Sequence, residues 1–327
     1  MKDKMIDILR RFMIPILFVV LCLVFSILSP YFFTWNNLVN IFIQQSYVVV
    51  VAVGLSFVMI SGGMDLSVGY QMSLVGVVTA MLMVNYNVPV PVAVCIGLVL
   101  GACLGAFNGL MAVTLNVHPL IITLATQTIF QGLSYTISGS KQIINLPDSF
   151  KFIGQGYIGP IPFAVILMVI VIVVASFILL KSKFGRYVYA LGSNQDAAYL
   201  AGINIKKTRI VVFTITGSLV ALATMILVAR TGSAQSSNGP GTEFTAMTAA
   251  ILGGISFIGG EGKITGVFLG VLLLGVLGNG MQLINMGTYA QYIVRGFVLL
   301  AAVGFDMYQK RKLSQAKKVE EPKAENA

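Results

Sequence analysis

Few side chains in this sequence could carry out chemistry. The single histidine, His118, has no second ligand or base near it in the sequence, and the cysteines Cys22, Cys95 and Cys103 lie inside apolar runs without metal-binding or redox spacing. The stretch GGEGKIT at 259–265 lacks the first glycine and the final Ser or Thr of a phosphate-binding loop. The sequence therefore predicts no catalytic group, no metal site and no cofactor bound by this chain.

The acidic residue that stands out is Asp65, in the stretch GGMDLSVGYQ (62–71) between two long apolar runs. We expect the paired glycines to end one helix, and Asp65 or Ser67 to accept backbone N–H bonds at the start of the next. This would place Asp65 in a turn at the cytoplasmic surface of a membrane. The alternative is a role in gating or in helix contacts near a solute path. The motif comprises Gly62, Gly63, Asp65, Ser67 and Gly69.

The composition indicates that lipid is part of the solvent. The 327 residues are 57% hydrophobic and 10% charged, whereas a soluble domain has about 25% charged residues. The first apolar segment has a basic flank but no small-residue cleavage site, so an uncleaved span is favoured over a signal peptide. We expect an all-α protein with ten transmembrane helices, at about 13–29, 41–60, 70–85, 90–113, 119–137, 162–180, 209–229, 244–258, 264–284 and 289–305.

The basic residues predict the orientation of these spans. With the N-terminus in the cytoplasm, 17 of the 21 Lys and Arg fall in inside segments and three in outside segments, while Arg295 lies within the last span. Both termini are then on the cytoplasmic side of the membrane. The net charge of +10 would face anionic headgroups and not nucleic acid. We expect residues 1–305 to form one membrane domain, followed by a disordered cytoplasmic tail at 306–327.

The sequence of the longest predicted cytoplasmic segment, 181–209, indicates one short helix at its centre. Ser193 and Asp196 have the spacing of a capping box, and Gly202 can take the left-handed conformation that ends a helix. Such a helix could rest on lipid headgroups. It could equally receive a partner protein that pushes on the membrane domain.

Polar side chains inside the spans could line a solute path. Small-residue stretches at 100–111 and 269–281 favour close helix packing, and each contains an Asn-Gly pair, as an inverted repeat would. Uncharged amides suit a neutral polyol, which needs hydrogen bonds without a counter-charge. Alternatively, such side chains only bridge neighbouring helices. The candidates are Gln44, Gln45, Asn108, Gln127, Asn279 and Gln282.

Four stretches of this chain resemble the permease subunits of ribose-type ABC importers, which belong to the branched-chain amino acid/ribose permease superfamily. They are LSPYFFTWNNLVNI (28–41), AVGLSFVMISGGMDLSVG (52–69), GRYVYALGSNQDAAYLAGINIKKTRI (185–210) and the segment 233–286. Met64 and the pair Gln195-Asp196 depart mildly from the family pattern, but the glycines are kept.

The resemblance implies a type II ABC importer-like subunit for a monosaccharide, a ribose-like pentose or a hexose. Its expected partners are a second permease subunit, an ABC ATPase that uses ATP and Mg²⁺ beneath segment 181–209, and a sugar-binding protein above, on outer segments 137–162 and 230–244. This chain would itself be no enzyme. The alternative is an ion- or proton-coupled secondary transporter of a small neutral solute. The positions matching the ATPase-coupling motif are Gly185, Arg186, Ala190, Gly192, Asn194, Asp196, Ala197, Ala198 and Gly202.

Overall fold

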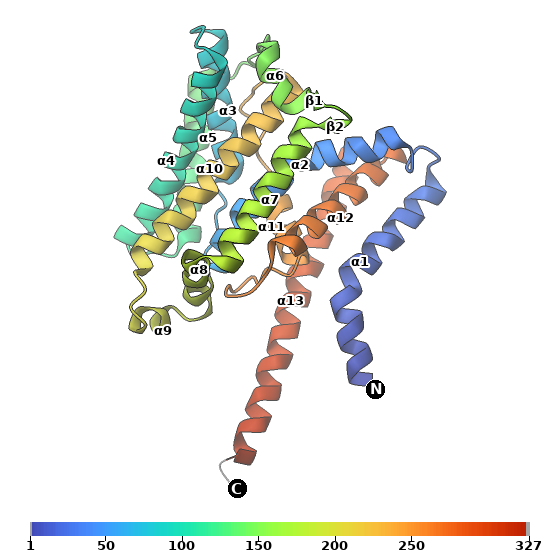
Figure 1. The fold of residues 1–327 in the computed structure, drawn as a ribbon, viewed down its shortest axis with the longest axis vertical. Helices are drawn as coiled ribbons and strands as arrows, with labels where there is room; N and C mark the ends of the chain where they lie inside the picture. The colour runs from blue at the N-terminus through green and yellow to red at the C-terminus, as the bar shows by residue number, and fades with distance from the viewer. Residues whose placement is uncertain (1, 325–327) are drawn as a thin grey trace.

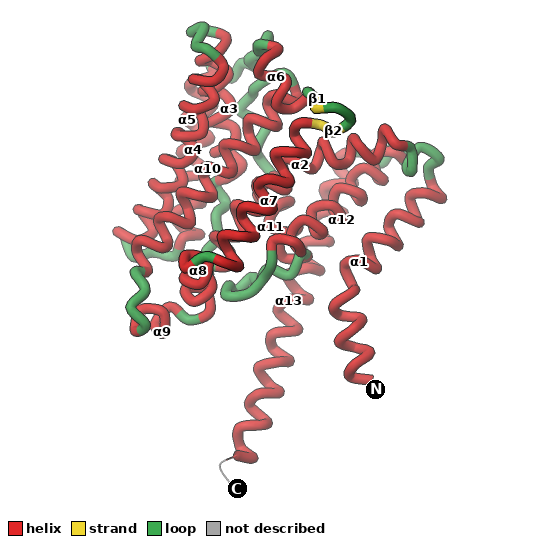
Figure 2. Tube along the Cα trace, viewed as in Figure 1, coloured by secondary structure: helices red, strands yellow, loops and turns green. Residues whose placement is uncertain are grey.

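Within residues 2–324, which the computed structural model describes, the chain folds almost entirely into helices (Figure 2). The helices are α1 (Lys2–Leu28), α2 (Trp35–Ile60), α3 (Val68–Val84), α4 (Val90–Thr114), α5 (Pro119–Ser138), α6 (Asp148–Gln155), α7 (Phe163–Lys181), α8 (Lys183–Ser193), α9 (Gln195–Leu200), α10 (Ile205–Thr231), α11 (Thr242–Leu252), α12 (Ile264–Leu283) and α13 (Thr288–Ala324). Two short strands, β1 (Tyr157–Ile158) and β2 (Ile161–Pro162), form an antiparallel hairpin.

Seven helices in the described part are long and apolar enough to cross a membrane: α2, α4, α5, α7, α10, α12 and the first part of α13. Helices α1 and α3 contribute shorter apolar stretches, at 15–28 and 68–84. Both chain ends lie at the same end of the molecule, and the β1–β2 hairpin lies toward the other (Figure 1). Helix α13 continues as far as Ala324, and the disorder expected of the tail at 306–327 stays a prediction.

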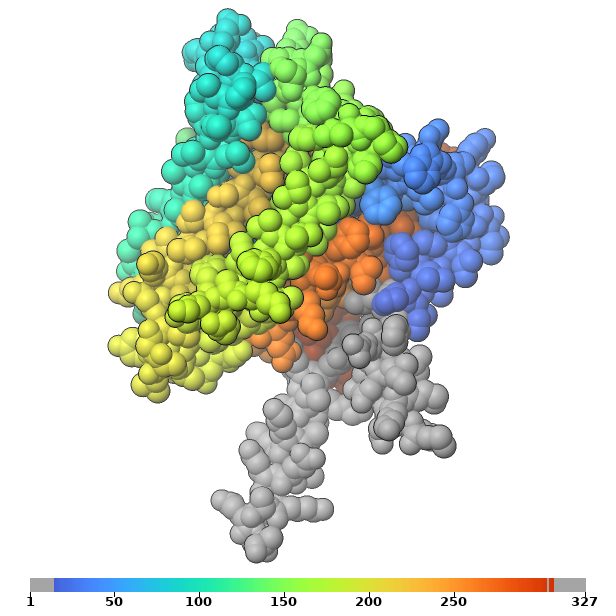
Figure 3. All heavy atoms as spheres, in the orientation of Figure 1, coloured from blue at the N-terminus to red at the C-terminus, as the bar shows by residue number. Residues whose placement is uncertain are grey.

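The core is built around α2 and α10. Every residue of α2 from Val48 to Ile60 is buried, and the Thr216 hydroxyl of α10 donates a 2.8 Å hydrogen bond to the Gly54 carbonyl of α2. Helix α4 packs on the opposite side of α10 through small residues, since a Cβ on Gly105 would overlap the Phe213 carbonyl. Figure 3 shows α7 crossing one face, with part of α12 at the surface between α7 and α1.

Helix α11 does not match the predicted span at 244–258. It has 11 residues and ends at Gly253, so its length is roughly 16 Å at about 1.5 Å per residue, half of a hydrocarbon core about 30 Å thick. The segment before it, 232–241, enters the bundle, where Ser233, Ser236 and Gly239 are buried. The apolar run 244–258 therefore includes a short helix and part of a loop, both packed against protein.

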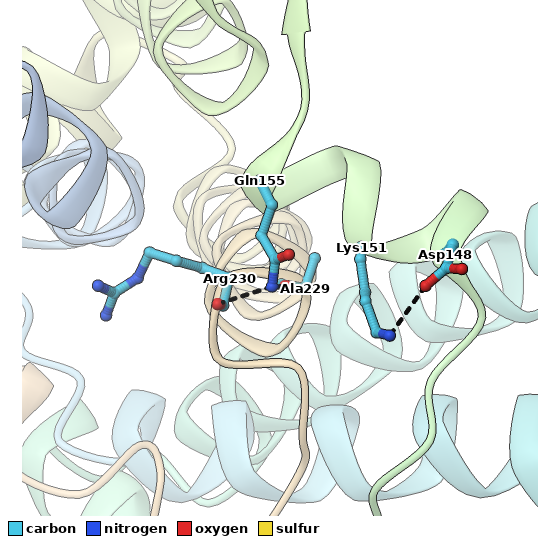
Figure 4. Close-up of polar contacts among 5 residues, drawn as sticks. All are labelled: Asp148, Lys151, Gln155, Ala229 and Arg230. Atoms are coloured by element: carbon cyan, nitrogen blue, oxygen red, sulfur yellow. Dashed lines mark hydrogen bonds and ion pairs between the residues drawn. The ribbon is translucent and has the colours of Figure 1, made fainter.

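The segment 137–162, which we expected on the outer side, contains a short helix, α6. Its Gln155 amide donates hydrogen bonds of 3.0 and 3.1 Å to the carbonyls of Ala229 and Arg230 at the end of α10 (Figure 4). An ion pair between Lys151 and Asp148 lies along its exposed side. These contacts fix α6 across the C-terminal end of α10.

Candidate functional site

A cavity of about 460 Å³ opens between α2, α11, α12 and α13. Its volume is in the range of small-molecule sites, about 300–1,000 Å³. Amide, hydroxyl and aromatic groups from separate parts of the chain meet in its wall. Its polar and aromatic lining residues are Gln44, Gln45, Tyr47, Asn238, Thr242, Phe244, Thr245, Thr248, Asn279, Gln282, Tyr292 and Arg295.

The structure brings four of the six proposed path residues together in this cavity: Gln44, Gln45, Asn279 and Gln282. Asn108 and Gln127 are not in its lining. Asn108 is fully buried in α4, where its amide donates a 2.8 Å hydrogen bond to the Ser67 hydroxyl, and Gln127 is half-buried in α5. The two Asn-Gly positions therefore have different surroundings.

Asn279 also bridges two helices. Its amide and that of Asn37 exchange hydrogen bonds of 2.9 and 2.8 Å, which join α12 to the first turn of α2. The sequence suggested two alternative roles for such amides, lining a solute path or bridging neighbouring helices, and Asn279 is placed to do both. Fixing Asn279 in this way also fixes one edge of the cavity wall.

Helix α11 contributes cavity residues that were not among the predicted ones. Thr242, Thr245 and Thr248 all line the cavity, and their spacing of three residues puts them on one face of a helix. This spacing could have marked a polar face within an apolar run. Arg295 also lines the cavity from α13, and no described carboxylate lies within ion-pair distance of it.

The motif at 62–69 lies inside the bundle and not at a surface. None of residues 61–70 is exposed, and Asp65 retains 3% of its accessible surface. One Asp65 carboxylate oxygen accepts hydrogen bonds from the Ser67 backbone N–H (2.9 Å) and hydroxyl (2.6 Å). Ser67 precedes α3 but its side chain makes no capping bond, so Asp65 is the acceptor at this helix start.

The start of α3 meets the start of α11. A Cβ on Gly69 would overlap the Glu243 carboxylate, and one on Gly239 would overlap the Gly69 carbonyl. The Gly239 N–H also donates to the Ser73 hydroxyl at 3.3 Å. Two short helices, each entered through a buried non-helical segment, therefore contact each other by their N-terminal turns.

The segment 181–209 contains two short helices where we expected one. Ser182 begins α8 by accepting a 2.9 Å bond from the Gly185 N–H, and Asn194 begins α9 by accepting one of 2.9 Å from the Ala197 N–H. The predicted capping box starting at Ser193 is wrong because the Ser193 hydroxyl donates back to the Tyr189 carbonyl within α8. Gly202 has a positive φ of 80°, as predicted for the residue ending the helix.

The positions of the coupling motif divide into two groups. Gly185 and Ala198 are buried, and Ala190 and Gly192 are half-buried against the membrane helices. The other positions are exposed and form what we call the coupling face: Arg186, Asn194, Asp196, Ala197 and Gly202.

The helices that carry the coupling face, α8 and α9, are attached to the membrane helices through backbone and side-chain contacts. A Cβ on Gly192 would overlap the carbonyl of Ile60, the last residue of α2. The Tyr189 hydroxyl donates a 2.7 Å bond to the Gly262 carbonyl, and Arg209 of α10 donates a 3.0 Å bond to Gln195 of α9. These contacts tie α8 and α9 to α2, to the loop before α12, and to α10.

Residues 37–303, which include both the cavity and the coupling face, match the family described as "Branched-chain amino acid transport system / permease component". The chain belongs to this permease family. It is therefore a multi-pass protein of the bacterial inner membrane, in agreement with its seven long apolar helices.

Curated relatives cover most of the permease. It is 36% identical to the ribose import permease protein RbsC of Haemophilus influenzae. The 294 aligned residues cover 89% of this chain and 91% of the relative. It is 39% identical to the D-allose transport system permease protein AlsC of Escherichia coli, over 86% and 87% of the two chains. The L-arabinose transport system permease protein AraH of Escherichia coli is 38% identical, over 90% of each. No solved structure matches the permease.

Proposed function

We propose that this permease forms the translocation path for a monosaccharide in an ATP-driven importer. The observation that carries the proposal is one chain holding two sites: a cavity lined by uncharged amides and hydroxyls, and a coupling face fixed to the helix that lines it. Helix α2 connects the two, because it carries Gln44 and Gln45 in its first half and ends at Ile60 against Gly192.

The cavity chemistry favours a neutral polyol. Amides and hydroxyls can donate and accept hydrogen bonds at the same position, so they can replace the water that surrounds sugar hydroxyls. The named relatives for ribose, allose and arabinose support a pentose or hexose as the substrate.

The proposed assembly has a second permease subunit, an ATPase beneath the coupling face and an extracytoplasmic sugar-binding protein. The proposed topology has ten membrane crossings in a single domain with both termini in the cytoplasm. The apolar stretches of α1 and α3 add two crossings to the seven long apolar helices of the described part. The tenth crossing is made by α11 together with the buried segment 232–241 that precedes it. ATP and Mg²⁺ would bind to the ATPase partner.

Co-purification tests the partner directly. Asp196 is exposed in the first turn of α9, so Asp196→Lys reverses the charge at this position of the coupling face without disturbing the core. We expect the wild-type permease to retain a nucleotide-binding partner and Asp196→Lys to lose it. Asp148→Lys is the matched control, since Asp148 is equally acidic and exposed but lies on α6 at the other end of the molecule. Loss in both variants, or in neither, would contradict the proposal.

The second candidate function is ion- or proton-coupled secondary transport, and the buried Asp65 favours it, because an ionisable group inside a membrane domain can act as a relay. Support for a relay is weak, because the described hydrogen bonds hold Asp65 to Ser67 and the other buried carboxylate, Glu243, to the Gly241 N–H, and do not join the two. Solute uptake that continues without ATP and stops with an uncoupler would favour this candidate over the importer.

A further inference from the structure

The cavity wall contains an unbalanced positive charge. Its lining includes no aspartate or glutamate, and Arg295 is the only charged residue among the lining positions that the structure describes. The Arg295 guanidinium lies beside Gly278 of α12, and no described acidic side chain forms an ion pair with it. A neutral sugar does not require this charge.

A second arginine adds to the same field. The guanidinium of Arg230 lies over the ring of Tyr47, 5.7 Å from its centroid, and Tyr47 is itself part of the cavity wall. Figure 4 shows the Arg230 side chain directed away from the α6 contact made by its own carbonyl. Its Nε is buried without a hydrogen-bond partner among the described residues.

The nearby carboxylate does not offset these arginines within the cavity. Glu243 is buried and accepts hydrogen bonds of 3.1 and 3.0 Å from the Gly241 N–H. It lies against Gly69, on the α3 side of α11, while Thr242, Thr245 and Thr248 face the cavity. Its carboxylate is thus held at the N-terminal turn of α11, outside the cavity lining. Arg295 is the charge within the lining, and Arg230 adds positive charge behind Tyr47.

We propose that Arg295 and Arg230 make the cavity an electrostatic barrier to protons and other cations. Fixed positive charge in a narrow, partly desolvated passage repels cations strongly, because the local dielectric constant is lower than in water. A neutral polyol has no net charge and passes the same field. The inference rests on the proposed function, since a sugar path through an energised membrane must not leak protons.

The test is proton flux into liposomes that contain the full-length permease and an internal pH-sensitive dye. A potassium gradient with valinomycin supplies the driving potential. Arg295→Gln removes the charge, and Thr248→Glu places a carboxylate in the same wall. Arg295→Lys keeps the charge, and Lys141→Gln removes an exposed basic residue that is not in the cavity lining.

We expect wild type, Arg295→Lys and Lys141→Gln to match empty liposomes, and Arg295→Gln and Thr248→Glu to raise proton flux several-fold. The elution volume in size-exclusion chromatography and the midpoint of thermal unfolding show which variants are folded. One folded variant of the pair Arg295→Gln and Thr248→Glu is enough for the test. If folded Arg295→Gln and Thr248→Glu show no more proton flux than empty liposomes, the proposed barrier is overturned. Lost sugar uptake in Arg295→Gln without proton flux would also overturn it, and would make Arg295 a sugar ligand. Absence of sugar uptake by the wild-type complex is measured separately and contradicts only the proposed function.

Discussion

The backbone N–H of Gly260 donates a 2.8 Å hydrogen bond to the carbonyl of Ile60, the last residue of α2. Gly192 of α8 lies against the same carbonyl with no room for a side chain. Three segments that are distant in sequence thus share one backbone group at the end of the helix that lines the cavity. A displacement of α8 would be transmitted to α2 through this contact.

Gly192→Ala should uncouple ATP hydrolysis from transport. The added Cβ would overlap the Ile60 carbonyl, so α8 and α2 must separate. We expect ATPase binding to persist, because the exposed coupling face is unchanged, while sugar uptake per ATP hydrolysed falls at least several-fold. Uptake and phosphate release would be measured on the same reconstituted complex.

Gly132→Ala is the control for that variant. Gly132 lies in α5 with no heavy atom within 4 Å of an added Cβ, and alanine favours a helix over glycine by about 1 kcal/mol. It should leave uptake per ATP unchanged. Equal ratios in Gly192→Ala and Gly132→Ala would show that the contact with Ile60 does not transmit movement.

Asp65→Asn should retain transport, whereas Asp65→Ala should not. Asparagine keeps an acceptor oxygen for the Ser67 N–H and hydroxyl, which Asp65 binds at 2.9 and 2.6 Å. Alanine leaves both donors buried without a partner, a loss of about 1–3 kcal/mol. Thermal unfolding and uptake would be compared for both variants. A stable Asp65→Asn protein without uptake would instead assign a role to the carboxylate charge or its proton.

Asn37 and Asn279 should show energetic coupling. Each amide both donates to and accepts from the other, so either single alanine variant leaves a partly buried amide with a lost partner. We expect each to reduce stability by about 1 kcal/mol or more, and the double variant to lose less than the sum of the two. Thermal unfolding of all four proteins measures this cycle, and additive losses would exclude the bridge.

Gln44→Leu should raise the sugar KM by about fivefold, which corresponds to losing one hydrogen bond of about 1 kcal/mol. Gln127→Leu is the matched control, since Gln127 is also an intramembrane glutamine but does not line the cavity. Initial uptake rates over a range of sugar concentrations give the KM of each variant. A larger rise in KM for Gln127→Leu than for Gln44→Leu would indicate that the sugar path runs beside α5 and not through the cavity.

Hydropathy predicted the long helices closely because length and composition alone specify them. The expected span at 119–137 corresponds to α5 at Pro119–Ser138, and 90–113 corresponds to α4 at Val90–Thr114. It failed at α11, because an apolar run is equally compatible with lipid and with burial among other helices. The Asn194 cap was missed for a different reason: Ser193 and Asn194 are adjacent, and both residue types favour helix starts.

The cavity was predictable only in part. Gln44, Gln45, Asn279 and Gln282 were identifiable as amides within apolar runs, but their convergence depends on how α2 packs against α12. Asn108 has the same local sequence pattern as Asn279 and yet contacts Ser67. Arg295 was visible as a costly intramembrane charge, and its surroundings required the tertiary structure.

The central claim is that ATP hydrolysis by a partner drives a sugar through this permease. The most direct measurement is uptake of radiolabelled ribose, allose or arabinose into proteoliposomes that contain the permease, its ATPase and its binding protein, with ATP and an uncoupler present. We predict that at least one of these sugars accumulates only when ATP is hydrolysed, and that the uncoupler has no effect. Accumulation without ATP that the uncoupler abolishes would contradict the claim.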